Sequence, residues 1–214
     1  MLKDIYTRIK SKLIYSNKIP QCALSKNLLF IHIPKAAGSM VSFQLYGGQI
    51  GHKKAKYYYI SDFVRYSSIR SFSVVRNPYS RFVSAYNFLS NGGMSSIDKE
   101  FKLNVIDKYN DINHFIVKVF DTKKGKLDFD VPHFDVQSDY LYYRSTLLVD
   151  YVFKLEDITG DDTIIKEMFN VDVAFSKKAN VSKDGYTVSD LNRMSLEILQ
   201  KIYHSDFEHF GYEK

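Results

Sequence analysis

The 214-residue chain has little cysteine and proline, with one and four residues respectively, and it has no tryptophan. The single cysteine, Cys22, excludes an internal disulfide and any cysteine-based zinc cluster. No apolar run approaches the roughly 20 residues that a membrane-spanning helix needs. The first segment also lacks the apolar core of a signal peptide. We therefore expect a cytoplasmic protein.

The overall composition indicates one globular domain, because 45% of the residues are hydrophobic and 25% are charged. The net charge of +6 suits an anionic ligand, a nucleic acid or an anionic membrane surface, so the charge alone selects no partner. We expect residues 1–27 to form an amphipathic segment packed on a core of residues 28–214. Leu2, Ile5, Ile9 and Leu13 recur there at helical spacing among basic residues, which would also suit a peripheral membrane contact.

Apolar runs that are typical of buried strands alternate with helical patterns along the chain. We expect strands at 28–33, 71–76 and 147–153. Helices are expected at 39–46, from Pro78 onward, at 163–169 and behind a Ser189 cap near the end, where an apolar stripe includes Met194. This alternation predicts an α/β domain with a mainly parallel sheet, whose ligand lies beyond the carboxyl ends of the strands.

Two turns, "IPKAAGS" and "VRNPYSRFVSAY", share one arrangement. In each, a buried strand ends at a cationic residue, Lys35 or Arg76, and a helix begins shortly afterwards. Asn77 is a favoured helix cap and Pro78 a favoured first helical residue. A helix N-terminus beside a fixed positive charge binds anions, so the pair of turns predicts a ligand with two anionic ends.

The familiar nucleotide fingerprints are missing from both turns. Lys35 precedes Gly38, whereas a Walker A loop places its lysine after the second glycine, and no GxGxxG pattern is present. A P-loop-like kinase that uses ATP and a basic nucleic-acid-binding domain remain as alternatives. The second is disfavoured because the cations gather at strand ends rather than along one helix, and we expect no nucleic-acid partner.

The segments "FIHIPKAAGS", "GHKKAKYYY", "FSVVRNPYSRFVSAY" and "VDYVFKLEDI" resemble the carbohydrate sulfotransferase superfamily in order and spacing. The resemblance extends from about Leu28 to the tail "DFEHFGY". It implies a single-domain α/β core like that of P-loop NTPases. It also implies transfer of a sulfuryl group from 3'-phosphoadenosine 5'-phosphosulfate (PAPS) to a hydroxyl of a saccharide or glycoconjugate.

The resemblance also implies roles for individual residues of the two turns. Lys35 would contact the oxygen that bridges sulfur and the 5'-phosphate, and Arg76 and Ser84 would hold the 3'-phosphate. The backbone of the first turn would add donors from Ala37, Gly38 and Ser39. The chain departs from the common family pattern at Ala36, where threonine is usual, and at Met40, where a hydroxyl residue is frequent. A catalytically weak nucleotide-binding homologue is therefore a further alternative.

The acceptor hydroxyl must lose a proton, and His52 is the first candidate for the base because "GHKKAKY" matches a family segment. The other reading is a solvated histidine. His133 is the second candidate for the base or an acceptor-side contact, with Gln137 nearby, and Glu156 would orient the acceptor or form a structural ion pair. His32 is expected in the core. We expect acceptor loops at 92–111 and 123–143, and no metal, because the acidic pairs lack ligand spacing.

Overall fold

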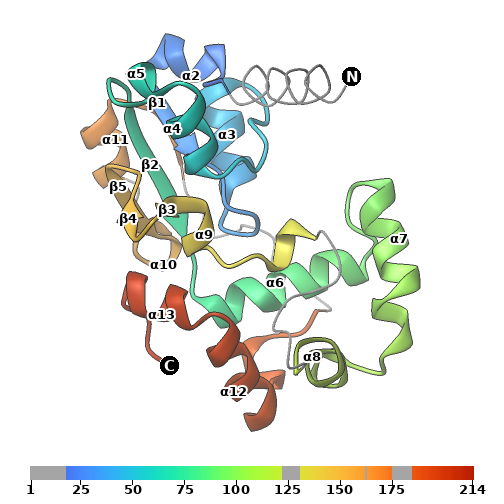
Figure 1. Ribbon diagram of the computed structural model, residues 1–214. Helices are drawn as coiled ribbons and strands as arrows, with labels where there is room; N and C mark the ends of the chain where they lie inside the picture. Colours follow the sequence, from blue (N-terminus) through green and yellow to red (C-terminus); the bar gives the residue numbers. More distant parts are fainter. Residues whose placement is uncertain (1–17, 122–130, 162, 175–184) are drawn as a thin grey trace, which may run out of the picture.

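A three-stranded parallel sheet forms the centre of the computed structural model, which describes residues 18–121, 131–161, 163–174 and 185–214 (Figure 1). Its strands are β1 (Leu28–Ile31), β2 (Arg70–Val75) and β5 (Tyr151–Lys154), in the order β1-β2-β5. This arrangement confirms the expected single-domain α/β fold with a parallel sheet. Residues 1–17 of the expected N-terminal segment lie outside the described residues.

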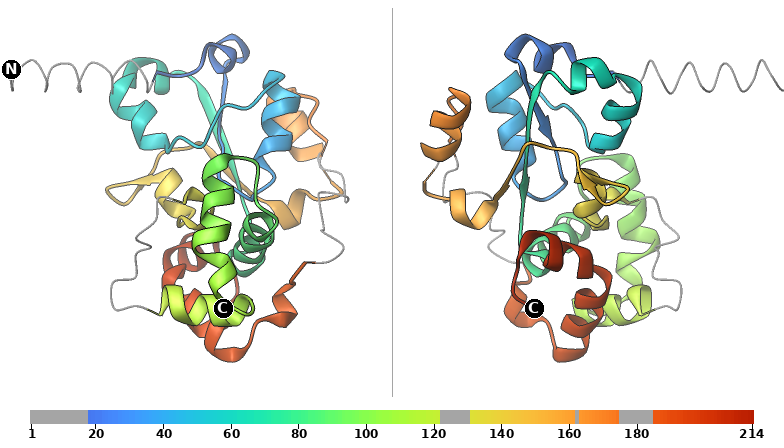
Figure 2. Two further views of the ribbon diagram at one scale, coloured as in Figure 1. Left: turned by 90° about the vertical axis from the view of Figure 1, so that its right-hand side faces the viewer. Right: turned by 60° about the vertical axis from the view of Figure 1, so that its left-hand side comes forward.

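Helices cover both faces of the sheet, because β1 and β2 are buried on both sides. The sheet residues Leu29 and Ile31 pack on one face against α2 (Gln21–Lys26), α4 (Ala55–Ser61), α5 (Phe63–Tyr66) and α9 (Ser138–Leu141). Leu28 and Phe30 pack on the opposite face against α3 (Gly38–Tyr46), α10 (Leu155–Ile158) and α11 (Thr163–Phe169). Figure 2 shows the two helical layers on either side of the strands.

A second, wholly helical half lies beyond the carboxyl end of β2 (Figure 1). It contains α6 (Pro78–Ser90), α7 (Ser96–Asn104), α8 (Ile112–Phe120), α12 (Arg193–Ile202) and α13 (His204–Phe210), with short 3-10 helices at Ile106–Lys108 and Val188–Asp190. Phe82, Phe115, Phe120 and Phe134 form its centre, with ring centroids 5.0–6.4 Å apart. Because α6 begins at Pro78 and enters this core, it links the sheet to the helical half.

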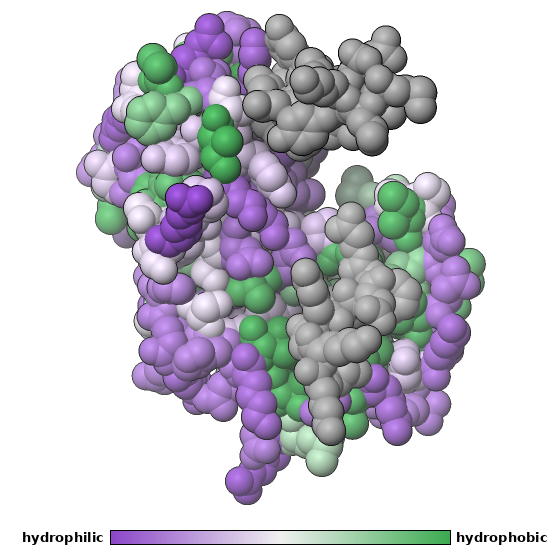
Figure 3. Space-filling view, in the orientation of Figure 1, coloured by the Kyte–Doolittle hydropathy of each residue, from purple (hydrophilic) through white to green (hydrophobic). Residues whose placement is uncertain are grey.

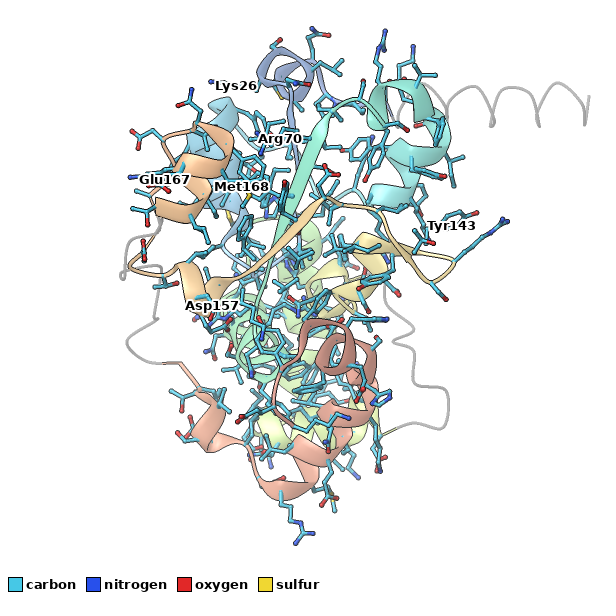
Figure 4. All side chains as sticks on the ribbon, turned by 90° about the vertical axis from the view of Figure 1, so that its left-hand side faces the viewer. Lys26, Arg70, Tyr143, Asp157, Glu167 and Met168 are labelled. Carbon is cyan, nitrogen blue, oxygen red and sulfur yellow. The ribbon has the colours of Figure 1, made fainter. Side chains whose placement is uncertain are left out.

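The predicted strand at 147–153 is wrong in its first half. Leu147 pairs antiparallel with Tyr142 in a separate hairpin of β3 (Tyr142–Tyr143) and β4 (Thr146–Leu147). The Asp150 carboxylate then accepts hydrogen bonds from the backbone N–H and the hydroxyl of Ser71, so β5 starts only at Tyr151. Figure 4 shows Tyr143 of the hairpin projecting away from the sheet, on the side opposite α11.

Arg70 at the start of β2 joins the sheet to α11. Its guanidinium donates a hydrogen bond of 2.7 Å to the carbonyl of Met168 and lies 4.7 Å from the ring centroid of Phe169. Arg70 and Met168 lie close together in Figure 4. The helix predicted at 163–169 is confirmed as α11.

Two further expectations are corrected by helix caps. The region 92–111 is largely helical rather than a loop, because Ser95 caps α7 and a 3-10 turn follows. The C-terminal helix α12 is capped by the side chain of Asn192, which accepts from the N–H of Ser195, and not by Ser189. Met194 is 57% exposed and therefore lies outside the apolar stripe. Residues 123–130 of the second expected acceptor loop lie outside the described residues.

Gly38, the first residue of α3, lies against the ring of the buried His32. A Cβ atom at position 38 would stand 1.9 Å from Cδ2 of His32, far inside van der Waals contact. The His32 ring is itself held by Phe30, at 5.9 Å between ring centroids. The absence of a side chain at Gly38 is therefore a packing requirement.

We predict that Gly38→Ala lowers the free energy of unfolding by about 1–3 kcal/mol, because the added methyl group displaces a buried ring. Urea unfolding measures the change. Gly48→Ala is the matched control, because a Cβ there meets nothing within 4 Å and the backbone is not left-handed. Equal stability of the two variants would contradict the packing requirement.

Candidate active site

The first cationic turn follows β1 and has an unusual backbone. Lys35 and Ala37 both have left-handed φ angles, of 67° and 60°, although neither is glycine. Such strain costs on the order of 1–3 kcal/mol per residue and is concentrated at functional sites. The nine-residue helix α3 that follows has no side-chain cap. Its first N–H groups and the curled backbone before it form the type of concavity that binds anions.

The Lys35 side chain extends toward the helical half of the molecule. Its Nζ lies 3.9 Å from the ring centroid of Phe88 on α6. Burial, and then the charge of Arg76, lower the pKa of Lys35 to about 8, whereas the Asp98 carboxylate raises it. Among the described residues, no carboxylate forms an ion pair with this amine. An anion would therefore stabilise its charge.

The second cationic turn begins at Arg76, directly after β2. Asn77 caps α6 by accepting from the N–H groups of Tyr79 and Ser80, which confirms the predicted start of this helix. The Arg76 guanidinium donates to Ser80 Oγ at 3.1 Å and to the Lys35 carbonyl at 3.4 Å. Burial lowers the pKa of Arg76. The two turns are thus in direct contact at one edge of the sheet.

Gln137 fixes the backbone of Arg76 through two hydrogen bonds. Its side-chain Oε1 accepts from the Arg76 N–H at 3.0 Å, and its Nε2 donates to the Arg76 carbonyl at 2.8 Å. The buried carboxylate of Asp206 accepts in turn from the N–H groups of Gln137 and Ser138. Burial raises the pKa of Asp206, while the Arg81 charge and these donors oppose the rise. Gln137 is fully buried, and both ends of its amide are occupied by the Arg76 backbone.

Arg81 is the largest fully buried side chain among the described residues. Its guanidinium donates to the carbonyls of Pro34, His133 and Asp135. It also lies 5.5 Å from the ring centroid of Tyr203. One charged group therefore holds the first turn and the segment around His133 at fixed positions.

Three histidines, His32, His52 and His133, lie close together near the first turn. The ring centroids of His32 and His52 are 4.1 Å apart, and those of His52 and His133 are 6.4 Å apart. His52 follows Gly51 in an exposed stretch, and its Nδ1 lies 3.3 Å from the His32 carbonyl. Burial is the main cause that lowers the pKa of all three rings, to about 3 for His32 and about 4 for His133. His32 is buried, as the sequence predicted.

Glu156 stands at the start of α10 and joins the second turn to the C-terminal tail. One oxygen accepts from the Asn77 N–H at 2.8 Å, and the other accepts from the Tyr212 hydroxyl at 3.0 Å. Lys154 donates to the Gly211 carbonyl at 2.9 Å beside this pair. The exposed Glu156 carboxylate is thus part of the support of the second turn, and its charge favours the ionised form of Arg76.

The structure places the remaining predicted residues around the two turns. Ser84 lies one helical turn beyond Ser80 on the same face of α6, half-buried, and Ser39 is exposed at the start of α3. Sequence reasoning missed Ser80, Arg81 and Asp206. Ser80 carries a detectable signal, because it lies four residues after Arg76 at a helix start. The sequence shows no comparable signal for Arg81 or Asp206, whose partners are distant in the chain.

The family model described as "Sulfotransferase family" matches residues 23–213. The chain belongs to the sulfotransferase family. No curated protein and no solved structure matches this sulfotransferase. Its two cationic turns lie at the carboxyl end of a parallel sheet, where ligands of such sheets bind.

None of the described helices of this sulfotransferase combines the length and apolar character that crossing a bilayer requires. Across the same residues, no group of three or more histidine, cysteine, aspartate or glutamate side chains is arranged to hold a metal ion.

The buried His32 predicts a loss of stability in acid. An unfolded chain binds a proton at His32 near pH 6.5, whereas the folded protein binds it only near the lowered pKa of about 3. Stability is therefore complete above pH 6.5 and falls as the pH is lowered from 6.5 toward 3. Between pH 7 and pH 5 this histidine accounts for a loss of about 2 kcal/mol.

His32→Leu removes that proton-binding group, so urea unfolding at the two pH values gives a smaller loss for the variant than for the parent protein. His204→Leu is the control, because His204 is exposed on α13. A variant that loses as much stability in acid as the parent would contradict the assignment.

Proposed function

We propose that this sulfotransferase moves a sulfuryl group from PAPS to a hydroxyl of a saccharide or glycoconjugate. The observation that carries the proposal is the hydrogen bond from Arg76 to the Lys35 carbonyl, which joins two cationic turns at one sheet edge. A ligand with two anionic ends, such as the PAPS nucleotide, can place one negative end at each cationic turn. ATP has the wrong anionic pattern for this pair, because its phosphates form one chain.

Lys35 and the start of α3 serve the 5'-phosphosulfate end in this proposal. Sulfuryl transfer resembles phosphoryl transfer, in which alignment and neutralisation of the leaving group supply most of the catalysis. The amine of Lys35 stabilises the charge that develops on the leaving phosphate. The N–H groups around Ala37, Gly38 and Ser39 provide fixed donors.

Arg76 and the hydroxyl face of α6 serve the 3'-phosphate. The guanidinium already donates to Ser80, and Ser84 continues the same face. Gln137 holds the Arg76 backbone, so the guanidinium starts from a fixed point. Pre-positioned charged donors of this kind bind phosphate without a large ordering cost.

His52 is the proposed base for the acceptor hydroxyl. Its lowered pKa keeps the ring neutral at neutral pH, which a base requires. Its Nδ1 faces the His32 carbonyl, an acceptor, so Nδ1 carries the proton and Nε2 is free to take one. His133 lies next to it on the proposed acceptor side.

We further propose that the protein is cytoplasmic and that residues 1–27 make a peripheral contact with a membrane surface.

We predict that Lys35→Met lowers turnover with labelled PAPS and a glycan acceptor by roughly 100-fold or more, because the leaving group loses its cationic partner. Transfer to a panel of glycans is the assay. Lys201→Met, on the exposed side of α12, is the control. Near-normal transfer by Lys35→Met would rule out this role.

Arg76→Ala is expected to weaken binding of adenosine 3',5'-bisphosphate by roughly 10-fold or more, because a charge-assisted bond to phosphate is lost. Calorimetry measures the affinity, and ATP is the competing nucleotide. The proposed PAPS site would be refuted if Arg76→Ala left the affinity unchanged. It would also be refuted if the parent protein bound ATP more tightly than adenosine 3',5'-bisphosphate.

For His52→Ala we expect a fall in turnover of roughly 100-fold or more, with adenosine 3',5'-bisphosphate affinity unchanged, because the base acts on the acceptor alone. His204→Ala serves as the matched control. A parallel loss of turnover and nucleotide affinity would count against a base.

A further inference from the structure

Helix α7 directs a buried carboxylate toward the site. Oδ2 of Asp98 accepts from the backbone N–H groups of Met94 and Ser95, at 3.0 and 2.9 Å, and so caps the helix. Oδ1 lies 3.4 Å from Nε2 of His133. The outer residue Ile97 is 67% exposed, and Figure 3 shows hydrophobic and hydrophilic residues mixed on the surface at α7. Asp98 thus faces inward, with one oxygen for the cap and the other for the histidine.

The surroundings of His133 bring it beside the proposed reaction centre. Its ring lies 5.0 Å from that of Phe88, the same ring that carries the Lys35 amine. The titratable groups that face His133 are Asp98 on α7, Lys35 on the first turn and His52 before α4. The His133 carbonyl is fixed separately by Arg81. The backbone and one ring nitrogen are therefore both held.

The contact with Asp98 also decides the tautomer of His133. Burial lowers the pKa of His133 to about 4, so the ring is neutral at neutral pH and carries one proton. Burial raises the pKa of Asp98, but the hydrogen bonds from Ser95 and Met94 outweigh burial and leave this pKa below its usual value, so the carboxylate is ionised and only accepts. The proton therefore lies on Nε2. Nδ1 remains a bare acceptor, buried and without a partner among the described residues.

We propose that Asp98 is a positioning residue for sulfuryl transfer. It fixes the orientation of His133 and the proton on Nε2, and so keeps a neutral ring in a set position beside His52, the proposed base. This inference rests on the proposed function. A carboxylate that orients a histidine in this way acts through that ring and does not touch the substrate.

The test separates positioning from helix capping. Asp98→Asn keeps the side-chain shape, but its amide can donate to Nε2 and favour a proton on Nδ1. Ser95→Ala is the matched control, because the Ser95 hydroxyl accepts from the Asp98 N–H at 3.1 Å and has no contact with His133. Nitrogen-15 NMR of labelled histidine reports the protonated nitrogen, and His133→Gln assigns its signals.

We expect Asp98→Asn to move the His133 proton and to lower acceptor-dependent turnover by roughly 10-fold to 100-fold. Its adenosine 3',5'-bisphosphate affinity should stay within a factor of two, and Ser95→Ala should retain the parent tautomer and turnover. A parent spectrum with the proton on Nδ1, or equal turnover in the two variants, overturns the proposal. Absence of transfer to any glycan by the parent protein refutes the proposed function instead, and the spectra still decide the tautomer.

Discussion

The buried guanidinium of Arg81 is the constraint on which the rest of the site depends. A charged group inside a protein is costly unless hydrogen bonds occupy it, and Arg81 is occupied by carbonyls from the first turn and from the segment 133–135. The carboxylate of Asp206 lies close enough to interact with the same charge. If either of the two bonded segments moves, its carbonyl and a buried N–H of Arg81 lose their hydrogen-bond partners.

This shared donor has an electrostatic consequence for the two turns. Arg81 and Gln137 hold Lys35 and Arg76 near each other, although Lys35 and Arg76 are both cations. Burial lowers the pKa of both side chains. The energy needed to keep like charges together comes from the surrounding fold. The doubly anionic ligand of the proposed function would relieve that repulsion, and the cationic groups are already in position before it binds.

Local signals predicted the first two strands of the sheet, the two turns and the helix start at Asn77, because each depends on neighbouring residues. The support beneath them could not be predicted, because Arg81 and Asp206 are 125 positions apart in the chain and meet only in the folded protein. The prediction of one strand at 147–153 was wrong in its first half because this apolar run contributes residues to two different sheets. Asp98 was missed although Ser95 and Asp98 form a recognisable capping pair, because a cap signal does not reveal what the second oxygen contacts.

The fit of the His32 ring over Gly38 has an evolutionary consequence. His32, directly after β1, and Gly38, at the start of α3, occupy one shared volume, so an increase in size at either position requires a decrease at the other. Homologous chains should therefore exchange these two residues as a correlated pair. The same pairing would limit how the first turn diversifies, since a larger side chain at the start of α3 fits only after His32 has been replaced by a smaller residue.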